Sequence, residues 1–133
     1  MEYNFTPVGF VHSNIKTQED APRHHTVSDE TGIIEILPEY QEGLYRIEER
    51  DCITVLFFFD KIDDKFDLWQ KPPTATNEKG VFSTCSPQRP NKIGVDILKL
   101  LKVDGNKLHV KHLDILDGTP VLDIKPFKPL WFN

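Results

Sequence analysis

The sequence predicts a mainly β domain, a small barrel or sandwich with long loops and short helical turns. Its apolar runs are short, turn-forming residues separate them at close spacing, and little of the chain follows a helical period. Many short strands joined by turns rich in glycine and proline are typical of barrels and sandwiches. At 133 residues the chain is expected to form one domain over residues 1–133.

The first part of the chain predicts an edge strand followed by a long loop. The segment YNFTPVGFV at 3–11 resembles a strand, but Pro7 and Gly9 interrupt it, so we expect an edge or bulged strand. Residues 12–32 are polar and follow neither a helical nor a strand period. Stretches of this length inside compact domains are usually functional or mobile.

A short strand, a helical segment and a buried strand are expected next. GIIEIL at 32–37 predicts the strand, and PEYQEGLYRIEE at 38–49 predicts one or two helical turns broken by Gly43. CITVLFFFD at 52–60 is continuously apolar and rich in β-branched and aromatic residues. It is too short for a typical helix, so we expect a buried central strand.

The second half of the chain predicts a hairpin and a final strand. Residues 64–80 begin extended and continue as a loop. GVDILKLLKV at 94–103 does not alternate strictly, but the Asp-Gly-Asn sequence that follows is a strong hairpin signal. We therefore expect strands at 94–103 and 107–113. The last strand, VLDIK at 121–125, follows an Asp-Gly-Thr-Pro turn.

Charge and cysteine content limit the environment and the partners. No apolar run reaches membrane-spanning length and no leader resembles a signal peptide, so the expected location is the cytoplasm and no membrane partner is expected. Cys52 and Cys85 are accordingly expected to stay reduced. The net charge of −5 disfavours indiscriminate nucleic-acid binding. Residues 1–78 carry 7 Lys or Arg against 16 Asp or Glu, whereas residues 79–133 carry 9 against 5. The basic part is either a phosphate-binding face or simply a differently charged surface.

The segment STCSPQRPNKIG at 83–94 is either a stiff turn or a pre-organised binding loop. Pro87 and Pro90 fix φ on both sides of Arg89, so its guanidinium is presented at low entropic cost. Arginine suits the planar oxygen pairs of carboxylates and phosphates. Asn91 offers both a donor and an acceptor.

The histidines do not predict a metal site. His109 and His112 are three residues apart, a spacing that suits a metal ion on a helix but points to opposite faces of a strand. His24 and His25 lie in the long loop, where they are either solvated or beside a site. The chain contains no G-x-S-x-G, P-loop or G-x-G-x-x-G motif, so hydrolase and dinucleotide-binding functions have no support.

A second candidate element is LDILDGTPVLDIKP. Its Asp117-Gly118-Thr119-Pro120 turn has a carboxylate and free backbone groups that could bind a ribose or an amino group. An ordinary turn in which Asp117 bonds its own backbone explains the same residues. Asp114, Asp123 and Lys125 lie close by in the sequence.

These segments resemble the TsaA-like family, also called TrmO and formerly VirR or YaeB. The resemblance rests on GVFSTCSPQRPNKIGVDILKLLKVDGN and LDILDGTPVLDIKPF, and PVGFVHS, APRHH and PEYQEGL extend it over nearly the whole chain. It implies a small single-sheet β-barrel, usually a homodimer, that binds S-adenosylmethionine (S-adenosyl-L-methionine). Characterised members methylate N6 of N6-threonylcarbamoyladenosine beside the anticodon of a threonine tRNA.

The resemblance also implies the site residues. Carried over by position, the residues that bind the methyl donor are Arg23, His24, His25, Phe59, Asp60, Cys85, Leu116, Asp117, Gly118 and Thr119. The residues assigned to catalysis and to the acceptor are Arg89, Asn91, Asp123 and Lys125. Departure of a proton from the acceptor nitrogen could be assisted by Asp117, Asp123, His24 or Lys125, and the sequence does not rank them.

Three positions depart from the family pattern. Cys85 stands where arginine is usual, Lys92 where proline is usual, and Phe59 where many members have histidine. The change at 85 removes a donor for a carboxylate, and Lys92 returns a positive charge seven positions later. Two alternatives therefore stay open: an S-adenosylmethionine-binding protein that acts on another substrate, and a non-catalytic binding module.

Overall fold

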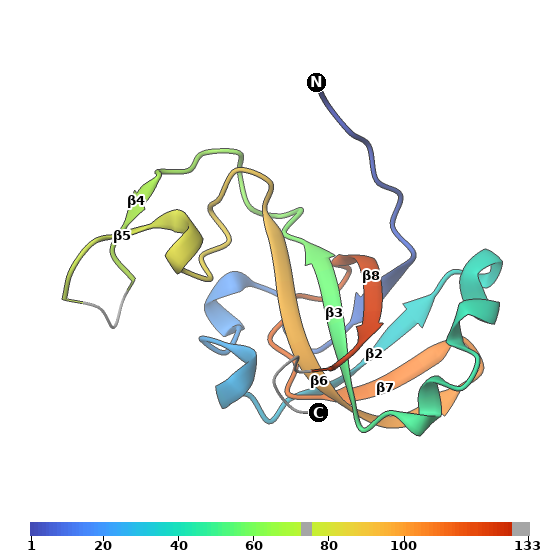
Figure 1. Ribbon diagram of the computed structural model, residues 1–133. Helices are drawn as coiled ribbons and strands as arrows, with labels where there is room; N and C mark the ends of the chain where they lie inside the picture. The colour runs from blue at the N-terminus through green and yellow to red at the C-terminus, as the bar shows by residue number, and fades with distance from the viewer. Residues whose placement is uncertain (73–75, 129–133) are drawn as a thin grey trace.

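The chain folds into a closed six-stranded barrel, described for residues 1–72 and 76–128 by a computed structural model. Around the barrel the strands follow the order β1-β2-β7-β6-β3-β8, and every neighbouring pair is antiparallel. Figure 1 shows β3 and β6 side by side. The expected mainly β class is confirmed, as a barrel. Its strands are β1 (Gly9–His12), β2 (Thr31–Ile36), β3 (Cys52–Phe58), β6 (Ile93–Asp104), β7 (Lys107–Lys111) and β8 (Pro120–Pro126).

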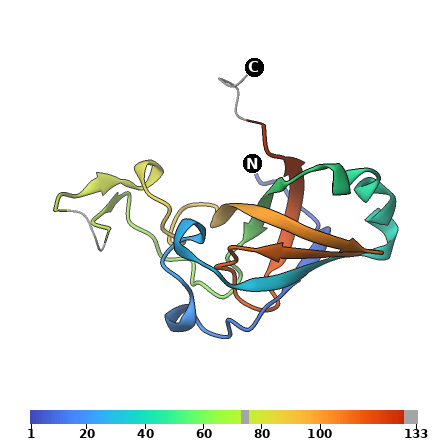
Figure 2. The same cartoon turned by 90° about the horizontal axis from the view of Figure 1, so that it is seen from below.

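A small two-stranded arm and five short helical turns complete the described structure. The arm pairs β4 (Trp69–Gln70) with β5 (Lys79–Gly80) and projects from one end of the barrel (Figure 2). No helix in residues 1–72 or 76–128 is long and apolar enough to cross a membrane. The turns are η1 (Gln18–Asp20), η2 (His25–Val27), η3 (Pro38–Leu44), η4 (Ile47–Glu49) and η5 (Val81–Ser83).

Several element boundaries differ from the sequence-based expectation. Regular strand structure begins at Gly9 rather than at residue 3, although Val8 already bonds Val121 and Leu37 through its backbone. Pro7 lacks the N–H that would extend this ladder. Gly43 does not break the helical segment, because η3 continues through it. The 64–80 stretch contains the β4–β5 hairpin, which its mixed polar composition did not signal.

The core lies inside the barrel and follows the two-residue period of the strands. In β3 the side chains of Ile53, Val55 and Phe57 point inward and are buried, while the residues between them are half-buried. The apolar run at 52–60 is therefore a central strand buried on alternate residues. Other strands and loops add Val11, Ile34, Ile36, Leu98, Leu108, Val110, Leu113, Ile115 and Val121 to the same cluster.

Strand β3 determines which loops meet. Phe58 at its end pairs with Ile93 at the start of β6, and Phe57 pairs with Val121 near the start of β8. Because both neighbours are antiparallel to β3, the chain that enters β6 and the chain that enters β8 lie beside the chain that leaves β3. The far end of the barrel carries η3 and η4 (Figure 2).

Replacing Leu98 by alanine tests the assignment of the core. Leu98 is 0% exposed in β6, whereas Leu101 in the same strand is 48% exposed. We expect Leu98→Ala to lower the free energy of unfolding by roughly 2–5 kcal/mol. The matched change Leu101→Ala should alter it by no more than about 0.5 kcal/mol. Urea denaturation measures both, and equal losses would contradict this inward and outward assignment.

Candidate functional site

A cleft opens at the end of β3 where the three chain segments meet. It has a volume of about 180 Å³. Its walls come from the loop that carries η1 and η2, the end of β3, the 84–96 segment and Asp114. The lining residues are Gln18, Pro22, Arg23, His24, Phe57, Phe59, Thr84, Cys85, Pro87, Arg89, Ile93, Gly94, Val95, Asp96 and Asp114.

A second, smaller hollow of about 20 Å³ adjoins the cleft. The two share four lining residues, so they lie on either side of the same side chains. The rings of Phe57 and Phe59 meet edge to face, with centroids 5.0 Å apart, and form an apolar partition. The shared residues are Gln18, Phe57, Phe59 and Asp114, and the second hollow adds Asp60, Lys61, Ile62, Ile115, Leu116 and Thr119.

The 83–94 segment is a tied turn whose arginine lines the cleft. Arg89 Nη1 donates to the carbonyl oxygens of Thr84 at 2.9 Å and Ser86 at 3.2 Å. Gln70 of the arm donates to the Gln88 carbonyl at 2.6 Å, which fastens the turn from outside. The stiff turn is therefore confirmed, and the binding-loop interpretation stays a prediction. The turn uses one guanidinium nitrogen for its own carbonyls, and the half-buried Arg89 side chain forms part of the cleft wall.

Glycine is required where this segment enters β6. Gly94 lines the cleft, and a Cβ atom there would collide with the Phe57 ring. The absence of a side chain lets β6 approach the aromatic partition closely.

Lys92 joins the loop before β6 to the loop after β3. Its backbone is left-handed, with φ of 49°, a conformation that proline cannot adopt. The buried side chain donates to the Ile62 carbonyl at 2.8 Å, pairs with Asp64 at 2.8 Å and lies over the Phe58 ring. The Lys92 hydrogen bond lowers the pKa of the Asp64 carboxyl. The positive charge introduced at this departure from the family pattern is thus used within the fold, and Lys92 does not line the cleft.

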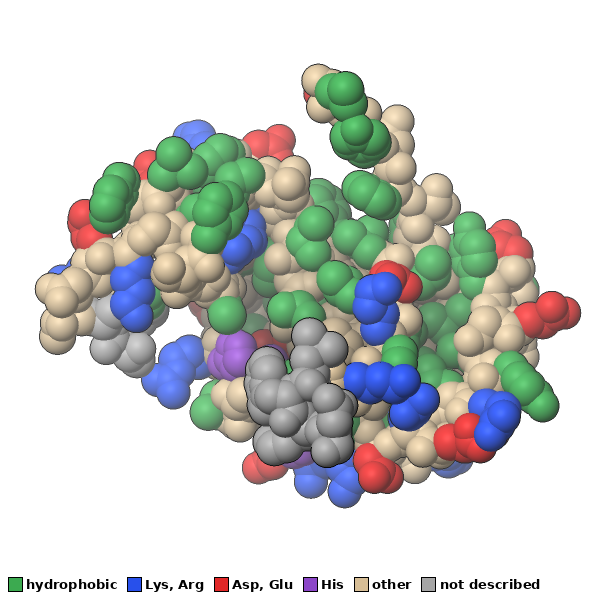
Figure 3. Space-filling view, in the orientation of Figure 1, with side chains coloured by type: hydrophobic (Ala, Val, Ile, Leu, Met, Phe, Trp, Pro, Cys, Tyr) green, Lys and Arg blue, Asp and Glu red, His purple; other side chains and the backbone are tan. Residues whose placement is uncertain are grey.

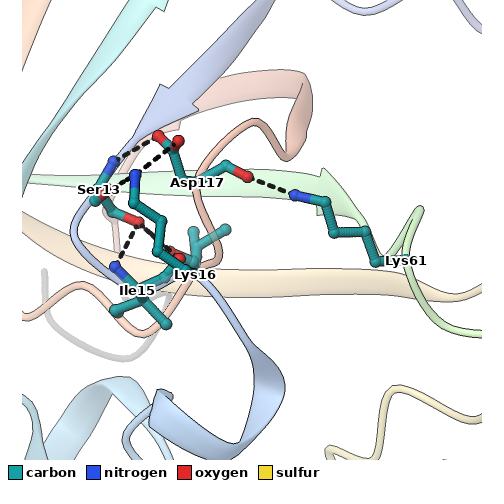
Figure 4. A network of polar contacts seen from close by, with 6 residues as sticks. Ser13, Ile15, Lys16, Lys61 and Asp117 are labelled. Carbon is teal, nitrogen blue, oxygen red and sulfur yellow. Dashed lines mark hydrogen bonds and ion pairs between the residues drawn. The ribbon is translucent and has the colours of Figure 1, made fainter.

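The Asp117 turn anchors the entry to β8, as Figure 4 shows. The carboxylate accepts from the Ser13 amide at 3.0 Å and from Lys16 Nζ at 2.9 Å, so it points toward the loop after β1. Lys61 donates to the Asp117 carbonyl oxygen. Gly118, with φ of 84°, donates to the Val11 carbonyl at 2.7 Å. The Lys16 hydrogen bond, then that of the Ser13 amide, lowers the pKa of Asp117.

Three titratable side chains, those of His25, Asp96 and Asp114, lie together at the floor of the cleft. His25 Nδ1 lies 3.2 Å from Asp96 Oδ1, and the His25 ring packs against that of His24 with centroids 4.1 Å apart. Burial raises the pKa of Asp96 to about 10, with further contributions from Asp114 and Cys85. Burial and the neighbouring His24 lower the pKa of His25. Both groups therefore favour their neutral forms.

The residues that the sequence assigned to the donor are divided among these features. The cleft is lined by Arg23, His24, Phe59 and Cys85, and the second hollow by Phe59, Asp60, Leu116 and Thr119. His25 lies beneath the cleft against Asp96. Asp117 and Gly118 belong to the anchoring turn.

The residues assigned to catalysis are less concentrated. Arg89 lines the cleft, whereas Asn91 is exposed on the loop before β6. Asp123 and Lys125 form an exposed ion pair at 3.3 Å on β8, opposite Leu56 and Thr54 of β3. Within residues 1–72 and 76–128, neither of them lines the cleft or the hollow beside it.

Sequence reasoning missed Gln18, Asp96 and the role of Asp114. A signal for Asp96 was present, because it is the one charged residue in the run IGVDIL and a strand that buries alternate residues places it inward. Gln18 carried no signal, since it lies in a polar loop without periodicity.

A small closed barrel with a cleft built by the loops at one end defines a ligand-binding β-barrel domain. Residues 10–131 match the family described as the tRNA-methyltransferase O N-terminal domain, and the chain belongs to this family. The resemblance noted in the sequence is thereby confirmed.

Two curated relatives and two crystal structures illustrate the similarity. An S-adenosyl-L-methionine-binding protein of Archaeoglobus fulgidus is 48% identical over 124 residues, which are 92% of this chain and 88% of the relative. The mouse tRNA (adenine(37)-N6)-methyltransferase is 34% identical over 128 residues, 91% of this chain but 30% of the relative. A crystal structure of TrmO matches 99% of this chain with a TM-score of 0.81 and 31% identity. A second, of TrmO from Pseudomonas aeruginosa, matches 99% with a TM-score of 0.78 and 29% identity. The chain spans 60% and 58% of these two solved chains.

Replacing Asp117 by asparagine tests the anchoring turn through pH. A carboxyl whose pKa is lowered by folding contributes stability above its ordinary pKa of about 3.9, and that contribution is lost as the pH falls through the folded-state value. We expect Asp117→Asn to be less stable than the unmodified chain at neutral pH, and the difference to narrow as the solution is acidified below pH ~4. Urea midpoints over this range measure it. Asp123→Asn, which removes an exposed pair, serves as the control. A deficit for Asp117→Asn that did not change with pH would contradict the assignment.

Proposed function

We propose that this protein is an S-adenosylmethionine-dependent methyltransferase that methylates N6 of adenosine 37 in tRNA. The observation that carries the proposal is the convergence of the family's motif segments on one cleft. The 22–24 loop, the 84–89 turn and the 114–119 segment, far apart in the sequence, all contribute to its walls or to the adjoining hollow. Family membership and the names of the relatives support the same conclusion.

The chemistry of the cleft suits the cofactor. The Phe57–Phe59 partition offers an apolar surface for an adenine ring, and Arg23 offers a cation for the carboxylate of the cofactor. At about 180 Å³ the cleft is smaller than the roughly 300–1,000 Å³ of a typical ligand pocket. We therefore infer that the cofactor extends past the partition into the hollow beside Leu116 and Thr119.

Catalysis by this chain is mainly a matter of position. S-adenosylmethionine would supply an electrophilic methyl group: the acceptor nitrogen forms the new N–C bond in line as the C–S bond breaks, and S-adenosylhomocysteine leaves. The tied 84–89 turn holds Arg89 ready for the acceptor, because its remaining guanidinium donors need no further ordering. Among the four residues proposed to assist loss of the acceptor proton, His24 is the one that lines the cleft. Asp117 is already engaged by Ser13 and Lys16. His24 Nδ1 lies 3.0 Å from the Thr26 hydroxyl and accepts a long hydrogen bond of 3.4 Å from the Thr26 amide. We therefore propose that the proton on N6 passes to His24 Nδ1, which gives up its contacts with Thr26.

We propose N6-threonylcarbamoyladenosine, in a threonine tRNA, as the acceptor. Its threonyl carboxylate is the planar, paired oxygen acceptor that Arg89 binds best, and a flanking phosphate offers the same chemistry. Asn91, Asp123 and Lys125 lie on exposed surface, so we assign them to the tRNA around the acceptor rather than to the cleft.

We further propose that the protein acts in the cytoplasm as a homodimer. Figure 3 shows apolar side chains grouped at its upper left, and the β4–β5 arm and the residues directly before β4 and after β5 carry four exposed apolar side chains. They are Phe66, Leu68, Trp69 and Phe82, which are 42%, 59%, 71% and 81% exposed. Contiguous exposed apolar surface of this kind favours a protein interface, and light scattering of the purified chain measures its oligomeric state.

A second candidate function is S-adenosylmethionine binding with a different acceptor. Cys85, which lines the cleft where the family usually has arginine, favours it because one carboxylate-binding cation is lost. The A. fulgidus relative is named for binding alone. A non-catalytic binding module is the remaining alternative.

Methylation of defined tRNA separates these functions. The purified chain is incubated with S-adenosylmethionine and either tRNA carrying threonylcarbamoyladenosine or the same tRNA with unmodified adenosine, and nucleosides are quantified by mass spectrometry. We expect methylation of the carbamoylated tRNA only. Arg89→Ala should lower the rate about 10- to 100-fold, since a hydrogen bond to a charged group contributes ~1.5–3 kcal/mol.

Arg46→Ala is the matched control, because Arg46 forms an exposed pair with Glu49 in the far-end η4 region. It should methylate at the unmodified rate. Methylation by Arg89→Ala at the full rate would contradict the role of Arg89. Cofactor binding by calorimetry without any methylated nucleoside would favour the second candidate function.

A further inference from the structure

Three side chains that could ligate a metal ion form a cluster at the floor of the cleft. His25, Asp96 and Asp114 each offer one donor atom, and these atoms all lie within 4.8 Å of one another. The residues come from η2, from β6 and from the segment that follows β7. They are separated widely in the sequence, so only the closed barrel brings them together.

The three side chains contain buried polar atoms without partners. His25 Nδ1, Asp96 Oδ2 and Asp114 Oδ1 are buried and have no hydrogen-bond partner among the residues that the structure describes. The Asp96 side chain is only 3% exposed. Buried polar groups are almost always paired, and an unpaired one needs an explanation such as a missing ion.

The cluster is held in place by contacts outside it. Ser28, at the end of η2, donates from its hydroxyl to the Leu113 carbonyl at 2.5 Å. The Ser28 carbonyl lies 2.8 Å from Nδ1 of His112. Glu30 accepts from the amides of both His112 and Leu113. These bonds fasten the loop that carries His25 to the residue immediately before Asp114, so they hold two of the three donors near each other.

A single proton shared by the two carboxyl groups accounts for part of this arrangement. It would join Asp96 to Asp114, in keeping with the burial of Asp96. It would leave His25 Nδ1 unpaired, because this nitrogen lies 3.2 Å from Asp96 Oδ1 without making a hydrogen bond to it. A divalent cation partners all three atoms and neutralises both carboxylates at once.

We propose that His25, Asp96 and Asp114 form a binding site for one divalent first-row transition-metal ion. One imidazole nitrogen and two carboxylate oxygens are a common donor set for Zn²⁺ and its neighbours. The donor atoms lie within 4.8 Å of one another, and bonds of about 2.1 Å to a tetrahedral ion would bring them to about 3.4 Å apart. Asp96 and Asp114 line the cleft, so a further coordination position faces it.

The ion acts on the cleft by fixing its walls. It ties the 22–28 loop, which carries Arg23 and His24, to β6 and to the segment before β8. The proposal concerns metal binding alone and does not depend on the methyltransferase function, so each can fail without the other.

The test is a Zn²⁺ competition titration of the full chain after removal of bound metal with a chelator. In the presence of a chromogenic chelator the unmodified chain should bind one Zn²⁺ per molecule. Asp96→Asn and His25→Ala should each weaken Zn²⁺ binding by at least the roughly 10- to 100-fold that loss of an outer-shell partner costs. His12→Ala is the matched control, because His12 also lies beside a carboxylate, Glu35, but on an exposed strand surface. It should bind Zn²⁺ as the unmodified chain does.

Three outcomes would overturn the proposal. The first is an unmodified chain that takes up no Zn²⁺ from the chelator, a result that needs no variant and stands even if Asp96→Asn fails to fold. The second is a His12→Ala variant that loses as much affinity as His25→Ala. The third is unchanged Zn²⁺ affinity in a folded Asp96→Asn, which would leave the shared proton as the account of the cluster.

Discussion

Strand β3 is hydrogen-bonded along its length to β6 on one side and to β8 on the other, and the rest of the structure depends on this pairing. It closes the barrel, because β6 leads through β7 to β2 and β8 leads to β1. It also selects the loops that can meet, since both neighbours are antiparallel and begin where β3 ends. A ligand site formed by those loops therefore stands on a rigid, fully paired strand rather than on the loops alone.

The loops at this end are fastened to one another by polar contacts in which each partner comes from a different loop. Lys92 joins the chain entering β6 to Ile62 and Asp64 after β3, and Asp117 joins the chain entering β8 to Ser13 and Lys16 after β1. The charged groups of Lys92 and Asp117 are thus paired within the fold. The arginines that line the cleft are Arg23 and Arg89. The cleft thus combines a stiff frame with a small number of charged groups, and its floor holds His25 and Asp96, whose Nδ1 and Oδ1 atoms lie 3.2 Å apart.

Local pattern was enough to predict the strand content and the β6–β7 hairpin, because alternation and an Asp-Gly-Asn turn act over a few residues. The motif resemblance was enough to predict the barrel, the family and five of the fifteen residues that line the cleft. Contacts between distant segments could not be predicted, such as Asp117 with Ser13 across 104 residues or His25 with Asp96. The left-handed backbone of Lys92 could not be predicted either, because lysine rarely adopts this conformation. The contacts that stabilise it are made with Ile62 and Asp64, which lie about 30 residues earlier in the sequence. Asp123 and Lys125 were assigned to the site because they match a family motif by position in the sequence. The motif does not determine which face of β8 they occupy, and both lie on its exposed face.

The central claim is that the cleft at the end of β3 is the cofactor site, and amide NMR spectra of the isotope-labelled chain titrated with S-adenosylmethionine test it most directly. The account predicts that the shifted amides lie in the 22–24 loop, at 57–61, at 84–96 and at 114–119, with little change around η3 and η4. A third hollow lies apart from this end of the barrel and provides the internal comparison; it is lined by Gly43, Leu44, Tyr45, Arg46, Ile47, Glu49, Arg50, Ile124, Lys125 and Pro126. Shifts concentrated at that hollow, with the 84–96 amides unmoved, would contradict the account.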